Sequence, residues 1–469
     1  MRKGILFLLV FISVSCFSQN KQILYNLTSV PQSLMMNPGA DFKYRFYFGV
    51  PLLSGTSFKV GSTGFSVYDL FANDGVDFNQ KLRNVVYSTN RNDHAAINEQ
   101  IEIFNGGIKL GDWLEDKGYL SFGMYQEFDL FAYMPKDLAI LALDGNQNYI
   151  GKSFNLGDLS MKSEVVSVLH VGYHKNISEK LIVGARAKIY FSGFNATTTR
   201  NSGSIITTTN PNTTVYNQEI NSNMSLNTSG ISKYTKDNYD GDVATDVRKQ
   251  LLFGGDMGLG FDAGFTYYPK DNIQITGSIL DVGFISHSKD VENFTWKGYY
   301  KYVGTNPNFS GTNDPNSVYD DFKEAIPLDT LHNKYTTLRP IKLNASYKYS
   351  FGTSSEEDCV CTATEKRYKN AVGAQFFMMS TPRLPITALT GFYQRNFSDK
   401  LQLKATYTLD SYSYTNIGLG FSANLGAFNM YFMADNLLEY RDVSKANSLS
   451  FQFGFNFIFK DSNEPPYRN

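Results

Sequence analysis

The sequence predicts an all-β fold, a closed antiparallel transmembrane β-barrel of about 14 strands with short helices in its loops. Three observations indicate it: apolar and polar residues alternate through many segments, many of these segments are 10 to 16 residues long, and aromatic residues are abundant. Of the 469 residues, 15% are aromatic and only 19% are charged, with 38 glycines and 14 prolines. This composition favours strands and turns over helices.

The charge balance and the hydropathy exclude two classes of protein. The chain has 43 basic and 44 acidic residues and a formal charge of −1, so electrostatics give no argument for a nucleic-acid partner. Beyond the first 20 residues no apolar run reaches the ~18 residues of a membrane-spanning helix, and the mean hydropathy is −0.28. A polytopic helical membrane protein is therefore excluded, whereas a membrane barrel is allowed.

The N-terminus has the pattern of an export signal. Arg2 and Lys3 precede the apolar run Ile5–Ile12, and small residues continue to Ser18. We expect cleavage after residue 18, with a lipoprotein signal at Cys16 as the alternative. Export of a barrel implies the cell outer membrane, where membrane lipid surrounds the protein.

The segment that follows the signal has two interpretations. It either folds inside the lumen as a plug or hatch, or adds a wall strand at Phe46–Pro51. The predicted division of the chain is a signal at 1–18, a plug or hatch at 19–56, the barrel at 57–460 and a periplasmic tail at 461–469.

Alternation with a period of two is the signature of a strand with one apolar and one polar face. Five apolar residues from Leu401 to Leu409 alternate with polar ones, and five phenylalanines from Phe451 to Phe459 mark the last strand. The same pattern occurs in residues 181–191, 252–267 and 417–425. Outer-membrane strands have about 9 to 11 residues, whereas soluble strands commonly have about 5 or 6. Because hydrocarbon tolerates no unpaired sheet edge, such a sheet must close.

Assigning turns and loops alternately to the two sides, starting from the C-terminus, gives the count of 14 strands. Short turns are expected in the periplasm and long loops outside. The predicted periplasmic connections are residues 115–118, 175–180, 269–272, 396–400 and 424–427 and the loop that carries Cys359 and Cys361. The predicted outer connections are residues 132–156, 200–249, 286–335, 380–384, 411–416 and 436–447.

Two outer segments differ in character. Residues 201–230 contain 18 Asn, Ser or Thr, which predicts a solvated, disordered loop. Residues 134–145 have Pro135 at a first helical turn and Gly145 at a C-cap, which predicts a short helix. The apolar surface of this helix comprises Leu138, Ile140, Leu141 and Leu143. It would cap the barrel, receive an apolar ligand or contact a partner.

Charged residues on the polar strand faces are the candidate lumen residues. They are Arg186, Lys188, Asp256, Asp262 and Lys404. They either form a constriction that selects solutes or only satisfy one another's buried charges. Asp281 breaks the pattern, because regular alternation would aim its carboxylate at lipid. A bulge, or the end of the strand at Gly283, should turn it inward or toward the membrane interface.

The sequence carries no motif for catalysis. It has no His-Glu-x-x-His pattern, nucleophile elbow or phosphate loop, and its five histidines are scattered. We expect no enzyme, no cofactor and no metal site. Cys359 and Cys361 are too few for a disulfide scaffold, although export makes a local bridge between them feasible.

Six runs of residues carry a resemblance to a known family. They are Met36-Asn-Pro-Gly-Ala40, Gly258-Leu-Gly-Phe-Asp-Ala-Gly-Phe265, Ser278-Ile-Leu-Asp-Val-Gly-Phe-Ile285, Leu338-Arg-Pro-Ile-Lys-Leu-Asn-Ala345, Asn416-Ile-Gly-Leu-Gly420 and Ala434-Asp-Asn-Leu-Leu438. In these runs the chain resembles DUF5723, a Bacteroidetes outer-membrane family of unknown function. It is also similar to the wider class that includes the fatty-acid channel FadL and PorV of the type IX secretion system. The resemblance implies a fourteen-stranded barrel with an N-terminal plug and carries no assigned activity.

Two functions fit these expectations. The first is a channel or transporter for small molecules, hydrophobic ones included, with a plug, a lateral gap or an apolar pocket beneath the outer helix. The alternative is a non-conducting, PorV-like barrel that binds secretion or cell-surface proteins through its outer loops. The expected partners are outer-membrane lipid together with a small-molecule ligand or such proteins, and no nucleic acid.

Overall fold

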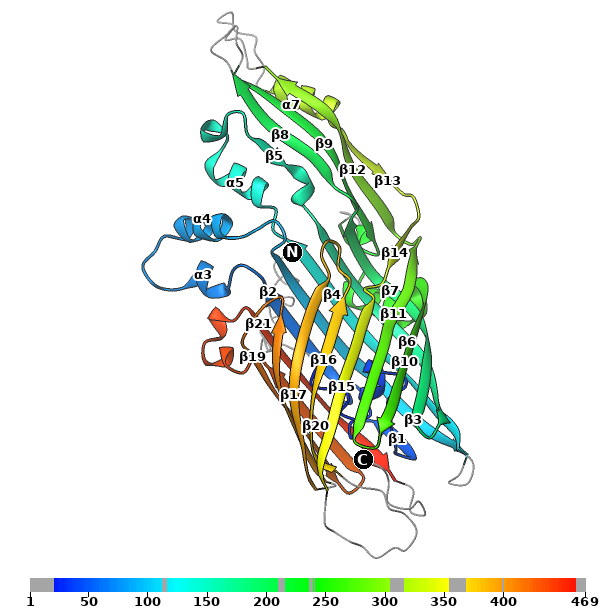
Figure 1. Ribbon diagram of the computed structural model, residues 1–469. Coiled ribbons are helices and arrows are strands. Elements are labelled where there is room, and N and C mark those ends of the chain that lie inside the picture. Colours follow the sequence, from blue (N-terminus) through cyan, green and yellow to red (C-terminus); the bar gives the residue numbers. More distant parts are fainter. Residues whose placement is uncertain are drawn as a thin grey trace, which may run out of the picture.

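The computed structural model describes residues 21–460 except 112–115, 210–215, 236–238, 240, 304–315, 354–367 and 399. The predicted signal, the cysteine-bearing loop and the C-terminal tail lie outside the described residues. The described chain forms one antiparallel sheet that closes into a tall barrel and continues above one rim (Figure 1).

The wall has fourteen strand positions, as the sequence predicts. β1 and β2 each pair with both β21 and β3, so they form one interrupted strand whose pairing with β21 closes the sheet. The wall strands are β1 Phe46–Gly49 with β2 Thr56–Ser62, β3 His94–Gly111, β4 Asp116–Tyr133, β6 Met161–Ser178, β7 Leu181–Thr198, β10 Asp256–Lys270, β11 Ile273–His287, β14 Tyr335–Leu338 with β15 Lys342–Thr353, β16 Tyr368–Met379, β17 Ile386–Ser398, β18 Leu401–Asp410, β19 Asn416–Leu425, β20 Phe428–Asp435 and β21 Ser448–Phe459.

The barrel begins earlier than residue 57, the start predicted for it. Phe46 to Gly49 pair in register with the end of β21, opposite Phe459 to Asn456. β1 lies within the alternative strand Phe46–Pro51, but it shares one wall position with β2 and adds no further strand. The separate N-terminal segment ends near residue 45.

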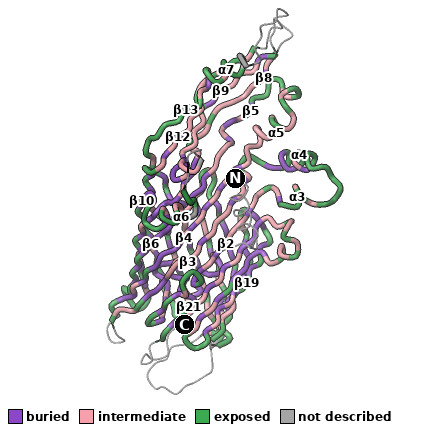
Figure 2. The backbone as a smooth tube through the Cα atoms, turned by 180° about the vertical axis from the view of Figure 1, so that it is seen from behind, coloured by how far each residue is buried: buried purple, intermediate pink, exposed green. Residues whose placement is uncertain are grey.

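The two faces of the wall have opposite character. On β19, Ile417 and Leu419 point outward with 38% and 46% of their surface exposed, whereas Asn416 is buried in the lumen. The other wall strands also alternate between outward apolar and inward, mostly polar residues, and Figure 2 shows buried and exposed positions alternating along the barrel. Apolar outside and polar inside is the arrangement of a transmembrane barrel.

This arrangement predicts the effect of an outward charge on folding. Leu419→Arg places a guanidinium in hydrocarbon and should destabilise the barrel by about 2–4 kcal/mol. Leu425→Arg is the matched control, because Leu425 lies on the same strand and face but at the terminal turn, where the cost falls to about 0–1 kcal/mol. Equal folding yields of the two variants in lipid vesicles would contradict the assignment of this face to lipid.

The connections alternate between two ends of the barrel, as the sequence predicts. Tight turns join β6 to β7, β10 to β11, β17 to β18 and β19 to β20 at one end, and the connections that carry helices or additional strands lie at the other. The end with the tight turns is the periplasmic end in this class of barrel.

The prediction of a disordered loop at 201–230 is wrong in its larger part. β8 Ser202–Thr209 and β9 Tyr216–Ser229 pair with each other, and β9 also pairs with β12 Val291–Tyr302. The polar side chains remain half-exposed while the backbone groups pair across the strands, so this sheet needs no large core of its own. With β5 Ser153–Asn155 and β13 Leu328–Leu331 it forms the extension above the outer rim (Figure 1).

Short helices lie among the outer loops. They are α3 Val67–Phe71, α4 Phe78–Ser88, α5 Lys136–Asp144, α6 Val243–Lys249 and α7 Asn316–Ala325. α5 is the helix that the sequence predicts, and Gly145 ends it with a φ of 68°. No helix within the described ranges combines the length and the apolar character needed to cross a membrane.

Candidate functional site

The lumen is occupied by residues 21–45, called the luminal segment below, which includes the one-turn helix α2 Ser33–Met36. Among the described residues, its backbone–backbone hydrogen bonds up to residue 42 stay within the segment. Its own apolar residues form a small core against the wall. That core comprises Ile23, Leu24, Tyr25, Leu27, Val30 and Met36, with Tyr431 and Met433 from β20. The segment is thus a separate body inside the barrel.

Side-chain hydrogen bonds tie the luminal segment to opposite parts of the wall. Asn26 Nδ2 donates to Ser346 Oγ on β15 at 2.9 Å. Gln32 Nε2 donates to Glu102 Oε2 on β3 at 3.0 Å. Lys404 Nζ on β18 donates to the carbonyl of Tyr25 at 2.6 Å. These three anchors are polar and none of them is part of the sheet ladder. Further wall side chains donate to backbone carbonyls of the segment, among them Arg186 to Met35, Thr266 to Gly39 and Ser278 to Met36.

Glycines on the inner wall face make room for the Met36–Ala40 run. A Cβ at Gly184 would lie 2.1 Å from the Pro38 carbonyl oxygen, and one at Gly264 would lie 2.1 Å from Asn37 Oδ1. Asn37 Nδ2 in turn donates to the carbonyl of Phe265 at 3.1 Å. The glycines that alternate with apolar residues in the sequence therefore form the seat of this run.

A buried ionic cluster lines one side of the lumen. Asp262 on β10 accepts from Arg186 Nη1 and Lys188 Nζ on β7, both at 2.9 Å. Lys188 Nζ also lies 2.6 Å from Asp281 Oδ1, and Lys342 Nζ lies 3.0 Å from Asp281 Oδ2. Each cation therefore contacts at least one carboxylate.

The cluster continues toward the outer rim. Arg339 contacts Glu127 at 2.7 Å and Asp129 at 3.5 Å, and it forms an ion pair with Glu164. Lys342 Nζ bridges this part to the Asp281 part, because it lies 2.9 Å from Glu127 Oε1. Such a closed network stabilises its own charges and holds neighbouring strands in register.

The structure separates the five predicted lumen residues into three places. Arg186, Lys188 and Asp262 meet in the ionic cluster. Lys404 holds the luminal segment instead. Asp256 lies at the outer end of β10, where it accepts from Ser229 Oγ and from the backbone of Ser288 and Lys289.

Asp281 turns inward through a bulge, which is one of the two explanations that the sequence analysis offers for it. The register between β10 and β11 shifts at this point, and Asp281 has a φ of 60°. Its carboxylate is 2% exposed and lies in the ionic cluster.

The sequence reasoning missed half of the cluster. It assigned no role to Glu127, Asp129, Glu164, Arg339 or Lys342. Glu127 and Asp129 alternate with apolar residues on a long strand, and this pattern could have identified them as lumen residues from the sequence. Arg339 precedes Pro340 in a connection between two short strands, and no periodic pattern marks it.

The predicted apolar helix is largely covered. Ile140 is buried against Val86 of α4 and Phe154 of β5, with Leu141 and Leu143 packed at the margin of this group. Leu138 is half-buried outside it. The helix joins its neighbours above the rim, and most of its apolar surface is used there.

A small cavity lies on the outer side of the luminal segment. It has a volume of about 70 Å³. Its lining mixes apolar side chains such as Met35, Phe377 and Met379 with charged ones such as Lys342. The mixture suits an amphipathic molecule.

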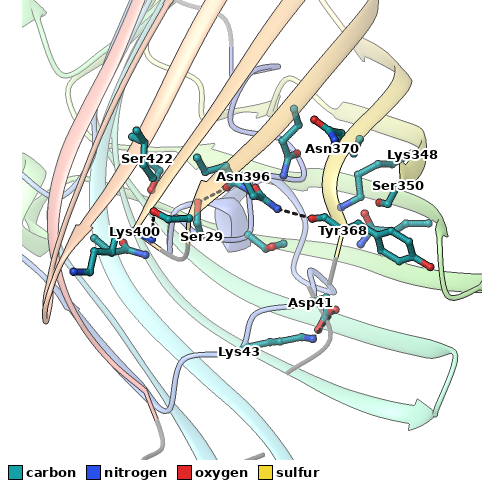
Figure 3. Close-up of a pocket in the computed structure, with 18 of the residues that line it drawn as sticks. Ser29, Asp41, Lys43, Lys348, Ser350, Tyr368, Asn370, Asn396, Lys400 and Ser422 are labelled. Carbon is teal, nitrogen blue, oxygen red and sulfur yellow. Dashed lines mark hydrogen bonds and ion pairs between the residues drawn. The ribbon is translucent and has the colours of Figure 1, made fainter. Parts of the chain in front are cut away.

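A larger pocket of about 160 Å³, called the inner pocket below, lies on the other side of the segment (Figure 3). It lies at the periplasmic ends of β15 to β19, and Ser29, Asp41 and Lys43 of the luminal segment form its inner side. Within the described part of the chain, no group of three His, Cys, Asp or Glu residues is placed to hold a metal ion.

The fold, the apolar exterior and the polar lumen define a transmembrane β-barrel of the outer-membrane type. The chain belongs to the family of unknown function DUF5723, whose model matches residues 38–435. The match begins at Pro38, within the Met36–Ala40 run of the luminal segment, and ends at Asp435 on β20.

Solved structures that resemble the chain include two bacterial toluene transporters and a FadL homologue. The toluene transporter TbuX of Ralstonia pickettii aligns with a TM-score of 0.40 and 11% identity, over 92% of this chain and 94% of that one. A FadL homologue of Pseudomonas aeruginosa aligns with a TM-score of 0.40 and 9% identity, over 95% and 99%. The toluene transporter TodX of Pseudomonas putida aligns with a TM-score of 0.37 and 8% identity, over 95% of this chain and 98% of that one. No curated protein sequence matches the chain.

Proposed function

We propose that the protein is a gated channel of the outer membrane for small molecules, with the luminal segment as the plug. One observation carries the proposal: a separate segment occupies the lumen without joining the sheet, and a cavity lies on either side of it. Displacing residues 21–42 breaks hydrogen bonds that involve wall side chains but no backbone–backbone hydrogen bond of the wall. The barrel can therefore open while its wall stays intact.

The lining supports solutes with both polar and apolar parts. Above the plug, Leu24, Met36 and Leu280 lie beside Lys21 and Gln100. Below the plug, amide, hydroxyl and lysine side chains dominate. A purely apolar molecule would have to desolvate these polar groups without hydrogen-bonding to them, which is unfavourable.

The test is solute flux through the barrel after the plug is removed. A variant without residues 21–40 retains the whole wall, because β1 begins at Phe46. Vesicles containing this variant should swell in isosmotic arabinose, and vesicles with the intact protein should swell far more slowly. Heat-modifiable gel mobility serves as the control for folding of both proteins.

The second candidate function is the binding of secretion or cell-surface proteins. The observation in its favour is the sheet of β5, β8, β9, β12 and β13, which rises above the rim with half-exposed polar faces. A folded deletion variant that gives no swelling would contradict the channel and favour this function.

A further inference from the structure

In the described lining of the inner pocket, lysines outnumber carboxylates. Lys43, Lys348, Lys400 and Lys460 line the pocket, and Asp41 is the one acidic residue among its described lining residues. Asp41 is engaged: it accepts from Tyr268 Oη at 2.7 Å and lies 3.8 Å from Lys43 Nζ. Among the described residues, no carboxylate lies within ion-pair distance of Lys348. The ionic cluster higher in the lumen has five carboxylates and, with Lys162 included, five cations, so this pocket differs from it electrostatically.

Two buried acceptors in the pocket lining also have no partner. Gln274 Oε1 and Gln394 Oε1 make no hydrogen bond within the described structure, although these side chains are only 4% and 6% exposed. Gln274 is held in place, because its Nε2 donates to Tyr268 Oη at 2.7 Å. Unsatisfied buried acceptors call for a donor such as a hydroxyl group.

The remaining polar lining is already organised. Ser29 Oγ donates to Gln402 Oε1 at 2.5 Å, Gln402 donates to Asn396, and Asn396 Nδ2 donates to the carbonyl of Tyr368 at 3.3 Å (Figure 3). This chain links the plug to one wall of the pocket. A ligand that contacts the pocket therefore contacts both the wall and the plug.

We propose that the inner pocket binds a small polyhydroxylated anion, a sugar acid or a sugar phosphate. The anionic group lies against Lys348, and hydroxyl groups donate to the oxygens of Gln274 and Gln394. The tyrosines and amides of the lining supply the further contacts that a hydroxylated ring requires. This inference rests on the proposed channel and names a solute class for its periplasmic side.

The test is equilibrium binding by calorimetry to the intact, detergent-solubilised protein, which needs no conduction. The probes are glucuronate and glucose 6-phosphate, and they distinguish a carboxylate from a phosphate ligand. Glucose, acetate and inorganic phosphate are the comparison ligands, because each lacks either the charge or the hydroxyl groups. We expect at least one of the two probes to bind about tenfold more tightly than any comparison ligand.

Variants locate the site. Lys348→Gln and Gln394→Leu should each weaken binding of the probe by about tenfold, because each variant removes one contact to the ligand. Lys369→Gln is the matched control: Lys369 is exposed at the same end of the neighbouring strand β16 and does not line the pocket. It should leave the affinity unchanged.

Each other outcome would overturn the inference. Absence of binding, equal affinity for glucose or for a simple anion, or equal weakening by Lys369→Gln would each do so. Absence of binding combined with swelling of the deletion variant would reject the pocket ligand and leave the channel intact.

Discussion

Arg339→Leu should abolish folding of most of the protein in detergent or vesicles. Arg339 is 1% exposed and is the cation shared by Glu127, Asp129 and Glu164. Its removal leaves these buried carboxylates with Lys342 and Lys162 as their remaining ion-pair partners among the described residues. Breaking a buried ion pair by removing one partner costs about 3–5 kcal/mol. The measurement is the fraction of protein with heat-modifiable mobility across a urea series.

Two further variants separate charge from packing. Arg339→Gln combined with Glu164→Gln removes one charge of each sign and should recover part of the lost stability. Arg395→Leu removes an arginine from the exposed face of β17 and should change stability by no more than about 0.5 kcal/mol. An Arg339→Leu protein as stable as the parent would contradict the structural role of the ionic cluster.

Gly264→Val should open the lumen without unfolding the wall. The first added carbon already falls 2.1 Å from Asn37 Oδ1, so the Asn37–Ala40 turn must leave its seat. Valine favours strands, and the residue lies within the β10 ladder, so the wall itself tolerates the change. Single-channel recordings should show open events that the parent lacks.

The matched control is Gly391→Val on β17. A Cβ at Gly391 meets no atom within 4 Å and points outward, so the substitution changes the sheet equally without reaching the plug. A folded Gly264→Val protein with the conductance of the parent would contradict the claim that Gly264 holds the luminal segment in its closed position.

Much of the fold follows from local patterns in the sequence. The strand count, the grouping of the connections at two ends and the short helix near Ile140 are confirmed because alternation, turn residues and helix caps are local signals. The start of the wall at Phe46 was predicted only as an alternative. Its four residues lie beside an irregular segment, and so short an alternation does not distinguish a wall strand from a luminal segment.

The site was less predictable, because its parts come from distant strands. Arg186, Lys188 and Asp262 were found by their charge on polar faces. Their counterparts near Arg339 lie on other strands, from Glu127 on β4 to Lys342 on β15, so nothing local joins them. Lys404 and Asp256 have the same sequence signal, but Lys404 contacts the luminal segment and Asp256 accepts hydrogen bonds from a turn. The glycine seat is likewise visible only when Gly184 and Gly264 stand next to Asn37 and Pro38.

The central claim is that the luminal segment closes a barrel that is otherwise open. The most direct measurement is single-channel conductance in planar bilayers, with the intact protein compared with the variant that lacks residues 21–40. The account predicts that the intact protein is closed at low voltage and that the variant has a steady open state. A steady open conductance of the intact protein equal to that of the variant, or a folded variant that stays silent, would contradict it.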